Sequence, residues 1–269
     1  KKGYFNKKFI ILNIYSYILK YEIKIMERKV YNRHIKNQKT HWWFSVRRKL
    51  ISEFIKRHSI KKKNLKILDY GCGSGTNIKS LVKFGKVFCY EKDKKTSDYL
   101  LSEYKKNKQV TVFKKLDKSI KYDYVILADV LEHIKDDTSA LKNLKKFIKP
   151  NGKILLTVPA YNFLFSKKDE VLKHFRRYSY NEIKNVVSKN YSVKRVTFFN
   201  TLLFLPIATI TIIFKALKID YIDDVEKTPN KIINNLLYFI FSLELFFLKY
   251  IDFPFGVSII IVGEKKKYS

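Results

Sequence analysis

The sequence contains few cysteines, glycines and prolines, and these shortages exclude several kinds of protein. Its 269 residues include two cysteines, Cys72 and Cys89, and no Cys/His pattern with the spacing of metal ligands. A disulfide framework and a zinc site are therefore not expected, and the chain suits a reducing cytoplasm. Eight glycines and five prolines exclude collagen-like chains, and no repeat of solenoid or propeller length is present.

Acidic residues are also scarce. The chain has 56 Lys and Arg against 24 Asp and Glu, which gives a formal net charge of +32. Such a charge can indicate a polyanionic partner, either nucleic acid or an acidic membrane surface. However, Lys, Ile, Asn, Tyr and Phe are enriched together and the lysines are spread along the chain, as a bias towards A/T-rich codons would also produce. Both interpretations remain open.

The only methionine is Met26, directly before a segment that we assign to the domain. Residues 1–25 are therefore interpreted as a non-native or disordered extension. Lysines precede the apolar stretch Phe9–Leu19, as in a signal peptide, but no small-residue cleavage site follows. Secretion is not favoured, and we expect a cytoplasmic protein.

From residue 65 onwards, short β-rich runs alternate with helical stretches. Alternation of strands and helices with short loops predicts a parallel sheet covered on both faces. The expected strands are 65–70, 86–91, 110–113, 124–128, 153–158, 191–197 and 257–262. The expected helices between them are 77–84, 96–105 and 138–148, with a further helix opened by Ser179 and Glu182. The Pro150-Asn151-Gly152 turn separates the third helix from the fifth strand.

Two apolar stretches precede the last predicted strand. Residues 196–214 are 19 consecutive uncharged residues, just long enough to span a bilayer, and residues 232–248 are interrupted only by Glu244. Asn200, Thr201 and Pro206 weaken the interpretation as a membrane span. We expect instead a helical hairpin that lies on a membrane, although a pocket cap or a dimer face remains an alternative. The lysines expected near anionic headgroups are Lys215, Lys218, Lys227, Lys231 and Lys249.

A glycine-rich turn carries the clearest chemical signal. It follows the strand at 65–70 and comprises Gly71, Cys72, Gly73, Ser74 and Gly75, ahead of a predicted helix. Glycines allow a ligand to approach the backbone, and a helix N-terminus offers unpaired N–H groups. Thr76 occupies the place of the third glycine of a dinucleotide motif, and no P-loop lysine follows, so a pyrophosphate ligand is disfavoured.

Two carboxylates follow the next two predicted strands. Glu91 comes 16 residues after Gly75, where a carboxylate can accept hydrogen bonds from both ribose hydroxyls. Asp117 follows the third strand and could face an adenine amino group. A simple surface role is the alternative for each of them, and several lysines surround Asp117.

These motifs together resemble a class I S-adenosylmethionine-dependent methyltransferase of the small-molecule or lipid-type subgroup. The resemblance covers about residues 65–160 and rests on Asp69-x-Gly71-x-Gly73-x-Gly75, Glu91, the run from Tyr122 to Ile134 and the run from Leu144 to Pro159. It implies an α/β, Rossmann-like three-layer sandwich with a mostly parallel seven-stranded sheet and an antiparallel last strand. The apolar helical insertion before that strand is unusual for the fold.

The resemblance also implies how S-adenosylmethionine would be held. Asp69 and the Gly71–Gly75 turn, Cys72 included, would line the methionine part. Glu91 would meet the ribose, Asp117 the adenine edge, and Asp129 would form the floor beside the methyl group.

Two further segments resemble the acceptor side of such enzymes. The His41–Arg48 segment, with Trp43, is similar to an aromatic entry helix that could form a lid, and Arg47 or Arg48 could meet the cofactor carboxylate. In the loop from Asp169 to Tyr178, the predicted acceptor-binding residues are Arg176, Arg177 and Tyr178, because arginines match phosphate. Aromatic core packing and a solvated basic loop are the respective alternatives.

Methyl transfer from a sulfonium needs mainly alignment and a dry pocket, so a dedicated base is optional. For a hydroxyl acceptor, His133 and His174 are the candidate bases. The leading prediction is methylation of a small-molecule or lipid-linked acceptor, on oxygen or, less favoured, carbon. An RNA methyltransferase is disfavoured because no Asn/Asp-Pro-Pro-aromatic motif follows the fourth strand. A non-catalytic membrane-surface protein on the same fold is the other alternative.

The predicted organisation has five parts. They are an extension (1–25), an N-terminal helical lid (26–64), the cofactor-binding core (65–199), the apolar insertion (200–255), and a final strand with a basic tail (256–269).

Overall fold

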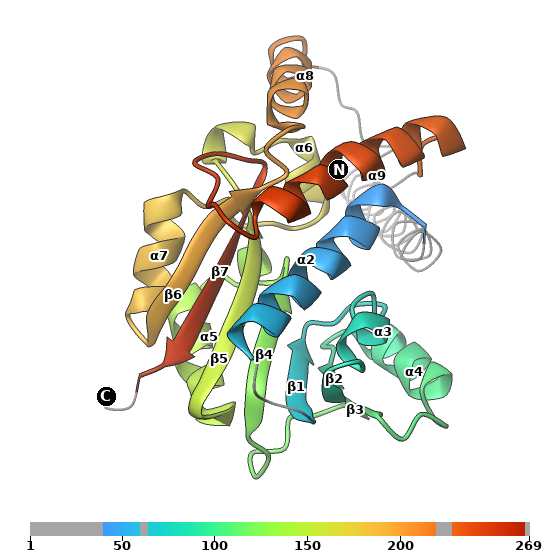
Figure 1. Cartoon of the computed structure of the whole chain (residues 1–269), viewed down its shortest axis with the longest axis vertical. Coiled ribbons are helices and arrows are strands. Elements are labelled where there is room, and N and C mark those ends of the chain that lie inside the picture. Colours follow the sequence, from blue (N-terminus) through green and yellow to red (C-terminus); the bar gives the residue numbers. More distant parts are fainter. Residues whose placement is uncertain (1–39, 60–63, 219–227, 267–269) are drawn as a thin grey trace, which may run out of the picture.

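The structure is a computed structural model that describes residues 40–59, 64–218 and 228–266 (Figure 1). The predicted 1–25 extension, most of the lid segment before residue 40, and Lys227 lie outside the described residues. The rest forms a seven-stranded sheet with helices on both faces.

The sheet has the strand order β3-β2-β1-β4-β5-β7-β6. All neighbouring pairs are parallel except those of β7, which runs antiparallel to both β5 and β6. The predicted antiparallel last strand is therefore confirmed. The strands are β1 (Leu65–Tyr70), β2 (Gly85–Tyr90), β3 (Val110–Phe113), β4 (Tyr122–Ala128), β5 (Ile148–Pro159), β6 (Tyr191–Phe199) and β7 (Ser258–Lys265).

Helices cover both faces because successive strand residues point to opposite sides. Ile67 packs into a cluster with α2 (Trp42–His58), α3 (Ile78–Leu81) and α4 (Lys94–Glu103), whereas its neighbour Leu68 packs on the face of α5 (Asp137–Leu144) and α7 (Tyr180–Ser188). The continuous apolar runs of the strands are thus explained by burial on two sides.

Helix boundaries follow local signals. Asp93 caps α4 by accepting from the Thr96 N–H at 2.9 Å. Ser179 and Glu182 form the predicted capping box of α7. The helix expected to reach residue 148 ends at Leu144, where a 3₁₀ turn follows (η2, Lys145–Phe147), and the Pro150 turn lies within β5 as an irregularity in its pairing with β4.

The apolar stretches form α8 (Phe204–Ala216) and α9 (Lys231–Phe247). The uncharged run does not form one helix, because its first residues complete β6. The expected hairpin was also wrong: α9 packs along α2, and α8 contacts the 3₁₀ turn η3 (Asn162–Leu164) (Figure 1). Asn234 explains the pairing of α9 with α2, because its side chain binds the start of α2. No helix in the described part of the chain is both long and apolar enough to cross a bilayer.

Candidate active site

A large cavity, about 1550 Å³ in volume, opens beside the carboxyl ends of β1, β2 and β4. Carboxyl ends of parallel strands are where open α/β sheets bind ligands. Its other walls come from α2, from the segment around α6 (Lys167–Val171), and from Ile207 and Thr211 of α8. Segments far apart in the sequence therefore meet around one space.

The glycine-rich turn forms the β1 side of this cavity. Gly71, Cys72 and Gly73 line it. Gly73 has φ +52°, and an added Cβ would meet nothing within 4 Å, so its backbone faces open space. Gly75, by contrast, faces inward, since an added Cβ would lie 2.8 Å from Ile78. The turn therefore leaves room for a ligand at Gly73, while Gly75 serves packing.

Glu91 lies beside this turn and lines the same cavity. Its carboxylate accepts hydrogen bonds from the Gly73 N–H and the Asp93 N–H, each at 2.9 Å. The side chain is thereby fixed in orientation, and each oxygen keeps a further lone pair for a ligand.

Asp69 lies behind the turn, fully buried. The Asn77 amide donates to one carboxylate oxygen at 3.5 Å, and the other oxygen has no hydrogen-bond partner. Burial raises the pKa of Asp69 to about 7, and the Asn77 hydrogen bond and the Arg47 charge only partly oppose this.

Asp117 lies away from the cavity. Its carboxylate accepts from the backbone and hydroxyl of Ser119, and these bonds hold its pKa below the usual value. Nothing near it in the structure favours the predicted adenine contact, which stays a prediction.

Asp129 lines the cavity at the end of β4, with φ +56°. It pairs with the buried guanidinium of Arg47 from α2 and accepts from the Thr157 hydroxyl at 2.7 Å. Arg47 thus neutralises a carboxylate of the cavity lining, and the predicted place of Asp129 beside the methyl group stays a prediction. The predicted contact of Arg47 with the cofactor carboxylate stays a prediction beside this pairing with Asp129.

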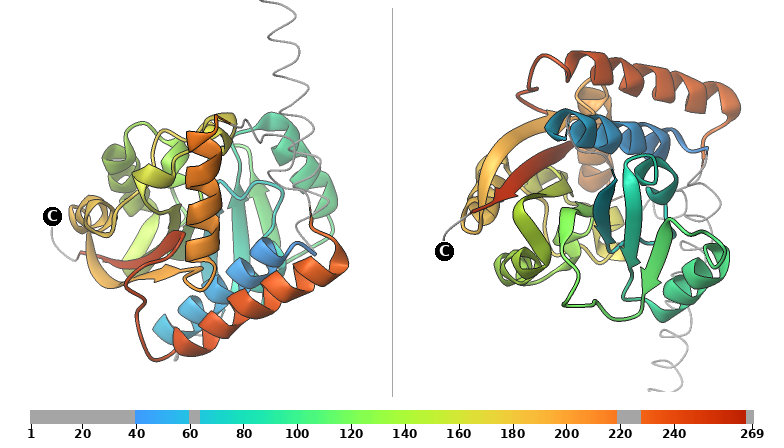
Figure 2. Two further views of the ribbon diagram at one scale, coloured as in Figure 1. Left: turned by 90° about the horizontal axis from the view of Figure 1, so that it is seen from above. Right: turned by 60° about the horizontal axis from the view of Figure 1, so that its bottom comes forward.

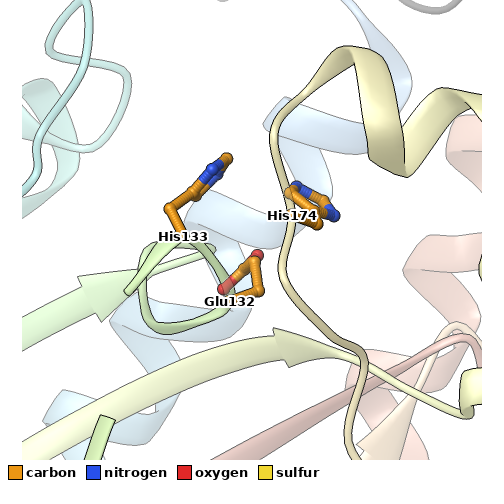
Figure 3. A group of neighbouring side chains, drawn as sticks. All are labelled: Glu132, His133 and His174. Carbon is orange, nitrogen blue, oxygen red and sulfur yellow. The ribbon is translucent and has the colours of Figure 1, made fainter. Parts of the chain in front are cut away.

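Three side chains of the cavity lining meet in a cluster: Glu132, His133 and His174 (Figure 3). Glu132 and His133 belong to the 3₁₀ turn η1 (Leu131–His133), and His174 comes from the loop after α6. One ligand atom from each lies within 4.8 Å of the others, close enough to contact a single acceptor oxygen or a single cation. The two imidazole rings are 4.6 Å apart and perpendicular.

Their environments set their charges. Burial and the neighbouring His174 lower the pKa of His133 to about 4, so it is neutral at neutral pH. Burial and Asp129 raise the pKa of Glu132 well above the usual value, and both of its carboxylate oxygens are unpartnered. Sequence reasoning had missed Glu132, although it lies in the Asp129–His133 motif next to the predicted His133.

Asp169 holds the loop that carries His174, and it too was missed. Burial favours its neutral form, but His174 and Arg177 outweigh this, so the pKa of Asp169 lies below its usual range. Its oxygens lie 2.8 Å from His174 Nδ1 and 2.9 and 3.0 Å from Nε and Nη2 of Arg177, and they accept from the Ser166 N–H at 2.9 Å. An ionised partner at Nδ1 leaves Nε2 of His174 as the acceptor.

The other predicted acceptor-binding residues of this loop are engaged internally. Arg176 and Tyr178 both donate to Asp137, at 3.1 and 3.0 Å, and neither lines the cavity. Arg177 does line it, but its guanidinium is paired with Asp169. Their predicted role in binding an acceptor stays a prediction.

Trp43 packs against the core and also lines the cavity, and its predicted role in a lid or in acceptor binding stays a prediction. It lines the cavity, and its ring stacks on Phe199 and Phe241 at 5.8 and 5.5 Å. A packed indole at the cavity wall presents an apolar surface to a ligand.

A family model described as "methyltransferase domain" matches residues 41–200, more than half of the chain. The ubiquinone biosynthesis O-methyltransferase of Pelagibacter ubique is 28% identical over 140 residues, which are 48% of this chain and 58% of the relative. The protein of the same name from Rickettsia bellii is 32% identical over 113 residues, covering 40% and 47%. The chain thus spans about half the length of the curated relatives it matches.

Solved structures show the same fold. Coclaurine N-methyltransferase, bound to N-methylheliamine and S-adenosylhomocysteine, matches with a TM-score of 0.52 and 15% identity over 81% of this chain and 70% of that chain. Phosphoethanolamine N-methyltransferase 2 of Haemonchus contortus matches with a TM-score of 0.51 and 17% identity, over 80% and 52%.

The fold is the Rossmann-like fold of these solved structures, and its cavity lies at the carboxyl ends of the parallel strands. The chain belongs to the methyltransferase-domain family.

Proposed function

We propose that this protein transfers a methyl group from S-adenosylmethionine to an oxygen atom of a small-molecule or lipid-linked acceptor. The observation that carries the proposal is that one cavity joins the Gly73 turn and Glu91 with Trp43, His133 and His174. The relatives named as O-methyltransferases support oxygen as the target. Nucleic acid is not proposed as the acceptor.

The residues present suit the cofactor. Gly73 faces open space, Glu91 is fixed with free lone pairs, and Asp69 has an unpartnered buried oxygen. We assign Glu91 to the ribose hydroxyls and Asp69 with the turn to the amino-acid part. When bound, S-adenosylmethionine supplies an activated methyl group on a sulfonium.

On the acceptor side, His174 is the base we propose. Asp169 orients it, so that Nε2 can accept the proton of an acceptor hydroxyl. His133 is a poor base because its pKa is about 4. Burial favours the protonated form of Glu132 by raising its pKa, and in that form the carboxyl group is a hydrogen-bond donor that can orient the acceptor oxygen.

We also place the reaction at the inner face of a membrane. The apolar helix α8 contributes Ile207 and Thr211 to the cavity wall, and several of its other side chains are exposed. An acceptor with an apolar tail would therefore meet apolar surface outside the cavity.

Calorimetric titration tests the cofactor assignment. We expect Glu91→Ala to weaken binding of S-adenosylmethionine and S-adenosylhomocysteine at least about 10-fold, because two charge-assisted hydrogen bonds are lost. Glu103→Ala is the matched control, since Glu103 is exposed on α4 and outside the cavity. Equal binding by both variants would refute the ribose assignment, and no binding by the folded wild type would refute the proposed function.

A second experiment tests the base. With radiolabelled S-adenosylmethionine and a panel of phenols and alcohols of increasing tail length, we expect His174→Gln to lower turnover about 100-fold or more. His58→Gln is the control, because His58 lies on α2 outside the cavity. Equal turnover by both variants would remove His174 from the mechanism.

A further inference from the structure

The outward face of α9 carries a continuous apolar stripe. Its members recur at spacings of four and three residues, so they lie within an arc of about 80° on a helix with 3.6 residues per turn. They are Ile232, Leu236, Phe239, Leu243 and Phe246, with exposed fractions of 80%, 55%, 60%, 40% and 59%. An exposed apolar surface of this extent marks an interaction site.

The rest of the protein fixes this orientation of α9. Phe241 is buried against Trp42 and Trp43, and the buried Glu244 accepts from the Leu202 N–H at 2.8 Å. Asn234 binds α2 as described above. The helix therefore cannot turn its stripe inward without breaking these contacts.

A basic groove borders the carboxyl-terminal half of the stripe. It lies between α2, α3 and α9, has a volume of about 560 Å³, and includes Phe246 of the stripe. Four lysines line it against one acidic residue, Glu53; they are Lys49, Lys56, Lys83 and Lys249. Lys49 donates to the Tyr238 hydroxyl, and Lys56, Lys83 and Lys249 have no carboxylate partner among the described residues. Ser52, Ser80 and Ser242 add hydroxyls.

We propose that this surface binds an anionic phospholipid bilayer, with a lipid phosphate in the lysine groove and the α9 stripe among the acyl chains. Helices that lie in a bilayer interface combine an apolar face with flanking cations in this way. In Figure 2, left, α8 and α9 both lie towards the viewer, and α8 contributes Ile207 and Thr211 to the cavity wall. The inference extends the membrane location proposed above and does not require the catalytic assignment.

A second copy of the chain suits the same surface less well. Pairing two stripes would bring two lysine grooves together, and the net charge of +32 opposes self-association. A bilayer with anionic headgroups instead satisfies the apolar stripe and the lysines together.

Sedimentation with vesicles tests the proposal on the full chain. We expect at least about 10-fold stronger binding to phosphatidylcholine vesicles that contain about 30% phosphatidylglycerol than to pure phosphatidylcholine, weakening at high salt. Lys56→Glu/Lys83→Glu should lose most of this binding, and so should Phe239→Ser/Phe246→Ser. The control Lys106→Glu/Lys108→Glu makes the same charge change on the exposed turn after α4 and should bind as the wild type does.

Three results would overturn the proposal. The first is equal binding of the wild type to both vesicle types. The second is equal binding by Lys56→Glu/Lys83→Glu and by the control Lys106→Glu/Lys108→Glu. The third is a dimer, seen by light scattering, that only Phe239→Ser/Phe246→Ser dissociates. Binding of S-adenosylmethionine is measured on every variant. A protein that binds vesicles without binding cofactor would contradict the proposed function alone, and the reverse result would contradict the docking surface alone.

Discussion

Two buried aspartates show how the surroundings of a single residue decide its charge. Asp69 has one long hydrogen bond and an unpartnered oxygen, and its pKa rises to about 7. Asp169 is equally inaccessible, but Arg177, His174 and the Ser166 N–H surround it, and its pKa falls. The same side chain therefore titrates near neutral pH behind the glycine turn, whereas in the loop its ionised form is favoured down to lower pH than usual.

Asp69→Asn should stabilise the cofactor-free protein at high pH and weaken cofactor binding. Because the pKa of folded Asp69 is raised, the folded state holds a proton that the unfolded state loses, so wild-type stability falls as pH rises from about 4 through about 7. Asparagine removes this loss, which is at most about 4 kcal/mol. Urea unfolding at about pH 5 and about pH 8 measures the part of this loss that falls between these two pH values. If the difference in unfolding free energy between variant and wild type does not grow with pH, the raised pKa of Asp69 is contradicted.

Asp169→Asn should destabilise the protein by about 3 kcal/mol at neutral pH, because Arg177 would be left buried without its counter-charge. Since the pKa of folded Asp169 is lowered, its contribution is present above about pH 4 and is lost as pH falls through the folded value. Chemical unfolding measures both effects. Glu170→Gln is the control, as its exposed pair with Lys167 should contribute less than about 1 kcal/mol. Equal losses in both variants would contradict the prediction.

At the scale of elements, side-chain contacts from distant parts of the chain decide where the helices lie. Asn234 of α9 accepts from the Trp42 N–H and donates to the Thr40 carbonyl, both at 3.0 Å, and so holds the first turn of α2, whose N-cap residue is His41. The apolar pattern predicted the two helices of the insertion but not their partners. Their separation depends on residues such as Asn234 and Glu244, whose partners lie elsewhere in the sequence.

Asn234→Ala should destabilise α2 by about 1–2 kcal/mol, because an orphan N–H is left at its start. Both tryptophans of the chain lie on α2, so intrinsic fluorescence reports the change directly. Asn235→Ala alters the exposed neighbouring residue and should leave both stability and fluorescence unchanged. A similar loss of stability in the two variants would show that Asn234 does not stabilise the start of α2.

At the scale of the whole molecule, 56 basic and 24 acidic residues create a repulsive field. The ion pairs between described residues neutralise part of it; several of these, such as Lys114 with Asp98, are exposed and weak. Compactness therefore depends on ionic strength.

We expect the melting temperature to rise by several degrees between about 0.05 M and about 0.3 M salt, because screening shortens the range of the repulsion. Calorimetry in sodium chloride and potassium chloride of equal strength separates screening from specific ion effects. A melting temperature that is constant or falls over this range would show that self-repulsion does not limit stability.

The sequence by itself determined the order of strands and helices, the glycine turn and the family. These depend on local periods of two and 3.6 residues, on capping residues and on glycine spacing, which are present before the chain folds. Only the tertiary structure decided that Glu132 lies beside His133 and His174. It also decided that the predicted acceptor-binding residues of the loop form hydrogen bonds with Asp137 and Asp169 instead of remaining unpaired. The packing of α9 on α2 with its apolar stripe outward was likewise a result of the tertiary structure. Asp169 binds His174 and Arg177 within its own loop. The other contacts join segments far apart in the chain and are set by packing and by the burial of charge rather than by local pattern.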